Sequence, residues 1–89
     1  MKDVTVNICN AAEKIESYPE NIQKLVWRAL HYQCEIKTRR SEFLRSPQPT
    51  AKDNEKLTKY IEVFRRTQQM IIKMCRKRDL KWIIIAEEN

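Results

Sequence analysis

A stripe of apolar side chains between residues 55 and 78 constrains the fold of this sequence most strongly. Its members recur at alternating spacings of four and three, which places them along one side of an α-helix with about 3.6 residues per turn. Residues 22–43 repeat the pattern with a spacing of seven. An amphipathic helix buries its apolar side against a partner, so the sequence predicts two long helices packed together. The stripe positions are Leu57, Ile61, Phe64, Gln68, Ile71 and Cys75 in one stretch and Ile22, Ala29, Ile36 and Phe43 in the other.

The segment between these stretches predicts a hairpin. Residues 46–52 contain two prolines separated by one residue and show no periodicity, which is typical of a loop. Short connections join antiparallel helices, so we expect helices over residues 19–45 and 53–78, the second capped by Asp53 or Asn54. Folding the chain back at the loop brings stripe positions face to face, namely Phe43 with Leu57, Ile36 with Phe64 and Ala29 with Ile71.

Gln33 and Gln68 occupy stripe positions that the hairpin would bring to the same level. A buried amide needs a hydrogen-bond partner. The two side chains therefore either bond to each other, as a polar layer that fixes the register of the hairpin, or lie at the edge of the stripe in water. The sequence leaves both alternatives open.

The two ends of the chain can be interpreted in more than one way. Residues 3–17 alternate like a strand at their start, but their apolar positions also fall at helical spacing; we favour a helix, with a strand followed by a short helix as the alternative. Residues 80–89 are rich in β-branched side chains and predict an extended or strand-like tail, which would pair with residues 4–8 if those are extended. The expected fold class is mostly all-α, with one domain over residues 1–89.

The sequence contains no glycine. Dinucleotide-binding and Walker-type loops need glycines at fixed spacing, so both are excluded. His31 and Cys34, three residues apart on the predicted helix, are the start of a nucleophilic pair or of a zinc site. Neither is completed by an orienting group or by further ligands at metal spacing, and no cleft is indicated around paired carboxylates. We therefore expect no enzyme activity, no catalytic residue, no metal and no cofactor.

The formal net charge is +6, and the excess lies on the two helical stretches. Lys59, Arg66 and Lys73 repeat every seven positions on the second stretch. The same spacing on the first stretch joins Lys24, His31, Thr38 and Arg45, with Arg28 between the first two, and the sequence therefore predicts two rows of cations away from the apolar stripe. Such rows on an elongated hairpin suit a phosphate backbone, so the leading hypothesis is binding of duplex RNA or DNA without strong sequence specificity. An ordinary solvated helix surface has the same composition. The candidate nucleic-acid-binding residues are Lys24, Arg28, Arg45, Lys59, Arg66 and Lys73.

The alternative function is a small protein-interaction module, such as an inhibitor or an assembly factor. The apolar stripe is wider than one partner helix requires, which is typical of a four-helix assembly made by a homodimer or with another protein. We expect a homodimer and no small-molecule substrate. The candidate interface residues are Val63, Met70, Trp82 and Ile84.

The three cysteines, Cys9, Cys34 and Cys75, lie far apart in the sequence and are expected to be free thiols in a reducing compartment. The N-terminus lacks an apolar run as long as that of a signal peptide. The longest unbroken apolar run, residues 82–86, is far short of the ~20 residues that a membrane-spanning helix needs. We therefore expect an intracellular protein, cytoplasmic or nuclear, that does not enter a membrane.

Overall fold

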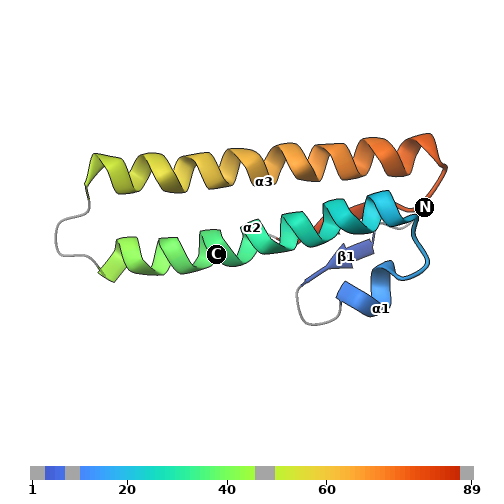
Figure 1. Ribbon diagram of the computed structural model, residues 1–89, viewed down its shortest axis with the longest axis horizontal. Coiled ribbons are helices and arrows are strands. Elements are labelled where there is room, and N and C mark those ends of the chain that lie inside the picture. Colours follow the sequence, from blue (N-terminus) through green and yellow to red (C-terminus); the bar gives the residue numbers. More distant parts are fainter. Residues whose placement is uncertain (1–3, 8–10, 46–49, 87–89) are drawn as a thin grey trace.

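The computed structural model describes residues 4–7, 11–45 and 50–86. The predicted antiparallel hairpin is confirmed, because its two long helices lie side by side and run in opposite directions (Figure 1). The chain measures 47 × 22 × 21 Å, and the hairpin accounts for this elongated shape. The elements follow in the order β1 (Val4–Val6), α1 (Ala11–Ile15), α2 (Glu20–Arg45), α3 (Ala51–Lys77) and β2 (Ile83–Ile85).

The helix α3 begins with a capping box, three residues before the expected cap. Thr50 is the N-cap: its Oγ1 accepts a hydrogen bond from the Asp53 N–H at 3.2 Å, and the Asp53 carboxylate accepts one from the Thr50 N–H at 3.3 Å. The prediction that Asp53 or Asn54 caps this helix was wrong, because the Thr50 hydroxyl is available earlier and Asp53 completes the reciprocal pair. The expected loop over residues 46–52 is therefore shorter, and its residues 46–49 lie outside the described residues.

The helix favoured for residues 3–17 was wrong at Val4–Val6, which form the strand β1. β1 pairs in parallel with β2, and Val4 lies opposite Ile83. The Val4 N–H donates to the carbonyl oxygen of Trp82 at 2.7 Å. Local spacing fits a helix and a strand equally well here, and the distant strand decides between them by offering hydrogen bonds to β-branched residues. The alternative, a strand followed by a short helix, is the one that the structure contains.

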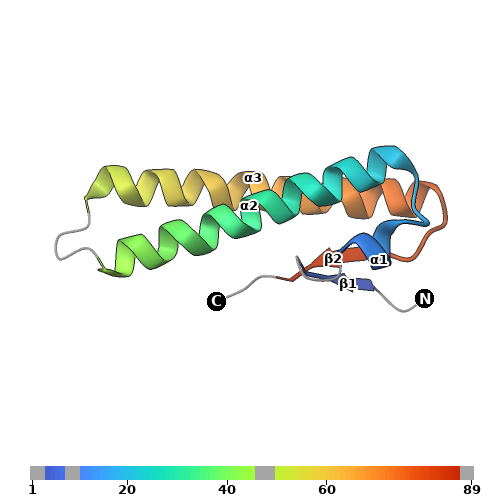
Figure 2. The ribbon, with the colours of Figure 1, turned by 60° about the horizontal axis from the view of Figure 1, so that its bottom comes forward.

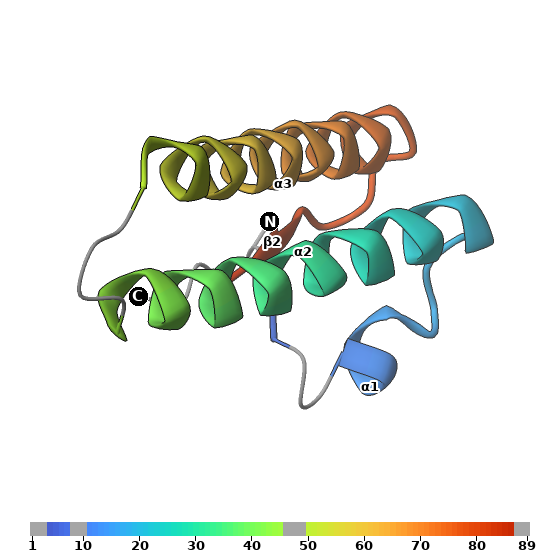
Figure 3. The same ribbon diagram turned by 60° about the vertical axis from the view of Figure 1, so that its left-hand side comes forward.

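The two-stranded sheet and α1 lie on one side of the hairpin (Figure 2). β2 runs along the line between α2 and α3 (Figure 3), and it contacts both helices. The chain turns back into this position directly after α3, where Asp79 has a positive φ of 54°. The Leu80 N–H donates to the Cys75 carbonyl oxygen at 2.9 Å and closes the helix end. The strand-like tail is thus confirmed, and it completes the core.

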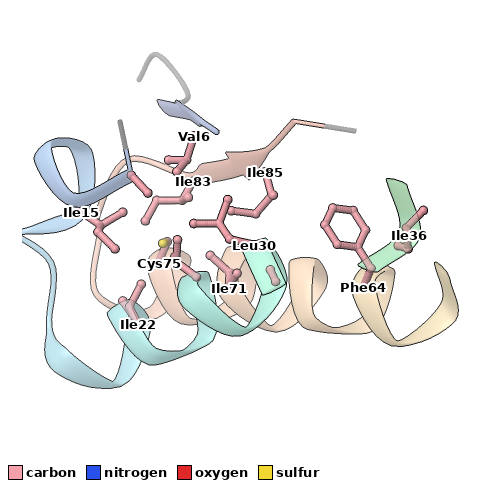
Figure 4. Close-up of a cluster of buried hydrophobic side chains, with 13 residues drawn as sticks. Val6, Ile15, Ile22, Leu30, Ile36, Phe64, Ile71, Cys75, Ile83 and Ile85 are labelled. Atoms are coloured by element: carbon pink, nitrogen blue, oxygen red, sulfur yellow. The ribbon is translucent and has the colours of Figure 1, made fainter. Parts of the chain in front are cut away.

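The core lies where the hairpin, the sheet and α1 meet (Figure 4). It contains the inward-facing residues of both strands, and Val6 and Ile83 are fully buried there. Ile36 and Phe64 form the far end of the core, as the predicted facing of these two residues requires. The buried hydrophobic residues are Val6, Ala11, Ile15, Ile22, Val26, Ala29, Leu30, Ile36, Phe64, Ile71, Cys75, Ile83 and Ile85.

Two glutamine side chains hold β2 against the hairpin. The Gln68 amide donates through Nε2 to the Ile83 carbonyl oxygen at 2.9 Å and accepts through Oε1 from the Ile85 N–H at 2.9 Å. Gln33 donates through Nε2 to the Ala86 carbonyl oxygen. Neither alternative expected for these glutamines is correct, because each amide bonds to the main chain of β2 or the residue after it. β2 and Ala86 supply partners for both amide atoms of Gln68 and for Gln33 Nε2, whereas Gln33 Oε1 is buried without a hydrogen-bond partner.

Beyond Ile36 and Phe64 the two helices continue without the sheet. We call this part, residues 37–45 and 51–63, the arm. Its apolar side chains are only partly covered, and Leu44 is 77% exposed. None of the described helices combines the length and the hydrophobicity needed to cross a membrane.

Candidate nucleic-acid interface

The side of the hairpin opposite the sheet carries no other described element, and we call it the open face (Figure 2). Helix periodicity determines which side chains of α2 point there. Leu30 is buried beneath the sheet (Figure 4). Arg39 follows Leu30 by nine residues. At ~100° per residue this is about two and a half turns of the helix, so Arg39 lies on the opposite side of α2.

A depression of ≈ 290 Å³ lies between the helices where the arm begins. We call it the Tyr60 hollow. α2 contributes one ring and one cation, and α3 contributes two cations, one ring and one aliphatic side chain. None of its described lining residues carries a carboxylate. The lining residues are Tyr32, Arg39, Lys56, Lys59, Tyr60 and Val63.

Arg39 is the most constrained cation of the hollow. Its guanidinium carbon lies 4.9 Å from the centre of the Tyr60 ring, within the range of a cation–π contact. Its Nε lies 3.7 Å from Oε2 of Glu35, an ion-pair distance, but this buried nitrogen has no hydrogen-bond partner. Tyr32 packs against Tyr60 with ring centroids 5.8 Å apart and an angle of 47° between the rings. Stacking thus holds the guanidinium in place.

A smaller depression of ≈ 100 Å³ adjoins the hollow toward the end of the arm. Arg39 and Lys56 line both depressions, while the smaller one also contains Glu42 and Asp53. The Thr50 hydrogen bonds lower the pKa of the Asp53 carboxyl below its ordinary value, which keeps it ionised. The described lining of the smaller depression thus combines two cations with two carboxylates, whereas that of the Tyr60 hollow contains three cations.

All six predicted nucleic-acid-binding residues are exposed, but the structure brings only Lys59 into the hollow. Lys24 forms an ion pair with Glu20 at 3.5 Å between side chains that are 76% and 83% exposed, a pair that contributes little. The sequence suggested that Arg39 extends the positive surface near the loop, but neither Arg39 nor Lys56 was among the six candidate binding residues. The register of the hairpin brings these two cations together. Tyr32 and Tyr60 are in contact, and Arg39 of α2 and Lys56 of α3 line the same hollow. The exposed predicted residues are Lys24, Arg28, Arg45, Lys59, Arg66 and Lys73.

The four predicted interface residues do not form one surface. Val63 is half-buried in the hollow, and Met70 is 52% exposed on the same helix. Trp82 is half-buried, with the Arg76 guanidinium carbon 4.7 Å from its ring centre. Ile84 pairs with Thr5 in the sheet, and alternation along the strand turns it away from the core. Other large exposed apolar side chains are Trp27 and Leu44.

The structure adds no support for a nucleophilic pair or a zinc site at His31 and Cys34. The His31 ring makes an edge contact with Tyr32 at 5.6 Å, and Cys34 is a half-buried free thiol. Within the described part of the chain, no group of three histidine, cysteine, aspartate or glutamate residues is placed to hold a metal ion. Cys9 lies outside the described residues.

No protein-family profile, curated protein or solved structure matches this chain.

Proposed function

We propose that this protein is a non-enzymatic nucleic-acid-binding protein that contacts the phosphate backbone of duplex RNA or DNA through the open face. The main support for the proposal is the Tyr60 hollow, whose described lining contains three cations and no carboxylate. Long helices with exposed cations suit a polyanion better than a small ligand, because each phosphate contact releases counterions.

The charge of the whole chain supports this proposal. A net charge of +6 attracts a polyanion from a distance and speeds the encounter. Arg28, Arg66 and Lys73 are exposed along the helices beyond the hollow. A span of seven residues along a helix covers ~10.5 Å, so the heptad row that includes Lys59 extends over several phosphates. Contacts of this kind position a duplex without reading its bases.

The open face is a poorer match for a second copy of the chain. A homodimer formed through it would bring two sets of cations together, and like charges in an interface oppose association. Of the large exposed apolar residues, Trp27 and Leu44 are 17 positions apart on α2, and Met70 lies on α3. Docking on another protein, homodimerisation and an intracellular location stay predictions.

The test is a mobility-shift measurement with an RNA duplex, a DNA duplex and a single strand, each at several salt concentrations. We expect micromolar binding to duplex with a steep loss as salt rises, each contact adding a slope of about −0.9 on the logarithmic plot for B-DNA. Light scattering of the free protein gives its oligomeric state. A chain that binds no duplex at low salt despite its charge would overturn the proposal and favour a protein partner.

A matched pair of variants tests the location of the surface. Arg66→Gln removes an exposed cation from the row on α3, and Lys81→Gln removes one from the segment before β2. We expect Arg66→Gln to weaken duplex binding and to reduce the salt slope by about one contact, while Lys81→Gln leaves both unchanged. Equal effects would show that net charge alone governs binding.

A further inference from the structure

The two tyrosine rings of the hollow have no free space between them. Their centroids are 5.8 Å apart, a separation at which aromatic side chains are already in contact. The Arg39 guanidinium covers the Tyr60 ring at 4.9 Å. Proteins that bind single strands stack bases on free aromatic faces, and these rings lack the gap that an inserted base would need. The two rings therefore leave no slot for a base between them.

The cations of the hollow are arranged for an anion of small size. Arg39 contributes a planar guanidinium fixed by stacking, and Lys56 and Lys59 add two exposed ammonium groups. Guanidinium groups match the geometry of phosphate oxygens, whereas lysines act as point charges.

The nearby carboxylates indicate where the anion would lie. Glu35 faces Nε of Arg39 at 3.7 Å. Glu42 and Asp53 line the smaller depression, which shares Arg39 and Lys56 with the hollow, and their negative charges disfavour an anion there. The Lys59 side of the hollow is free of carboxylate among its lining residues.

We propose that the Tyr60 hollow binds a single phosphate group of the nucleic-acid backbone between Arg39 and Lys59, and that it makes no contact with bases. This inference rests on the proposed function and assigns its anchoring contact. The hollow would then bind single strands and duplexes alike through their phosphates. Any preference for a duplex would arise only from the remaining cations of the open face.

The test uses the chain of residues 1–89. A DNA strand competes with an abasic strand of the same length, which has the sugar-phosphate backbone but no bases. We expect the two strands to compete equally well. A DNA strand that competes more than about fivefold better would show that bases are bound and would overturn the inference.

Substitutions at Arg39 complete the test, with Arg76 as the matched control because it also lies over an aromatic ring. We expect Arg39→Gln to weaken duplex and abasic-strand binding about tenfold, the loss typical of one charge-assisted hydrogen bond. Arg39→Lys keeps the charge but not the planar group, so its loss should be smaller. Arg76→Gln removes the same charge and should leave affinity unchanged.

The outcomes separate this inference from the proposed function. If wild-type protein binds no strand or duplex, the proposed function fails. If it binds, and Arg39→Gln binds as well as Arg76→Gln, only the phosphate site is wrong. Thermal melting of each variant shows whether it folds. Lys59→Gln, a change at an exposed position, provides a second test that does not disturb the stacked pair; unchanged binding by this variant would also overturn the site.

Discussion

The side chain of Gln68 pairs with the main chain around Ile85 as a neighbouring strand would. It accepts from the Ile85 N–H and donates to the carbonyl oxygen two residues earlier, both at 2.9 Å. β1 occupies the other edge of β2. A helix thus supplies, through one amide, the hydrogen bonds that a third strand would have supplied, and the short sheet can lie against the hairpin with its inner edge satisfied.

Replacement of Gln68 by alanine tests this role. The substitution leaves the Ile85 N–H without its partner in a region where Ile85 is 2% exposed. An unsatisfied buried group costs about 1–3 kcal/mol, and 1 kcal/mol corresponds to about 4–8 °C in melting temperature for a domain of this size. We expect Gln68→Ala to melt about 10 °C lower by circular dichroism. Gln69→Ala, at the exposed neighbouring position, should change the melting temperature little; equal losses would contradict the role.

The periodicity of the apolar residues was sufficient to predict the hairpin, because the apolar stripes on both helices are long and each stripe packs against the other. The facing of Ile36 and Phe64 followed from counting residues back from the loop. The strand at Val4–Val6 could not be obtained in this way, since its hydrogen-bond partners lie nearly the whole chain away. Gln33 and Gln68 were misassigned for the same reason: a hairpin considered without β2 offers them only each other or water.

The candidate site likewise contains residues that the sequence could identify and residues that it could not. Exposed cations such as Lys59 and Arg66 could be selected from their spacing. Arg39 could not, because its importance depends on a ring from the other helix, Tyr60, and on the absence of carboxylates from the lining of one hollow. The spacing of charged residues describes one helix at a time, whereas the hollow is formed by side chains of both α2 and α3.

The turn after α3 offers a stabilising substitution. Asp79 has a φ of 54°, a left-handed conformation that costs most residues about 1–2 kcal/mol but glycine almost nothing. Aspartate tolerates this region better than most residues, and glycine also raises the entropy of the unfolded chain, so the net gain should be small. We expect Asp79→Gly to melt a few degrees higher.

The neighbouring residue is the control for this turn. Arg78 has a φ of −103°, which any residue adopts, so Arg78→Gly gains nothing in the folded state and should melt lower than wild type. A lower melting temperature for Asp79→Gly as well would show that the aspartate side chain stabilises the turn more than its backbone conformation costs.

The buried thiol of Cys75 should be protected from alkylation. Cys75 has no exposed surface, and burial raises the pKa of its thiol, so less reactive thiolate is present at neutral pH. Cys34 is half-buried and more accessible. In native protein treated with iodoacetamide, peptide mass spectrometry should find Cys34 labelled before Cys75, and urea should abolish the difference. Early labelling of Cys75 in the native state would contradict its place in the core.

The capping box predicts a specific acid response at the start of α3. Hydrogen bonds from Thr50 favour the ionised form of Asp53 and lower its pKa. The lowered pKa means that the stabilisation is present above the ordinary aspartate pKa of about 3.9 and is lost as pH falls through the lower folded value. Carbon-detected NMR titration should therefore give Asp53 a midpoint below its ordinary value. In Thr50→Ala the midpoint should move back up, because the hydroxyl bond is gone; an unchanged midpoint would assign the shift to neighbouring charges such as Lys56 instead.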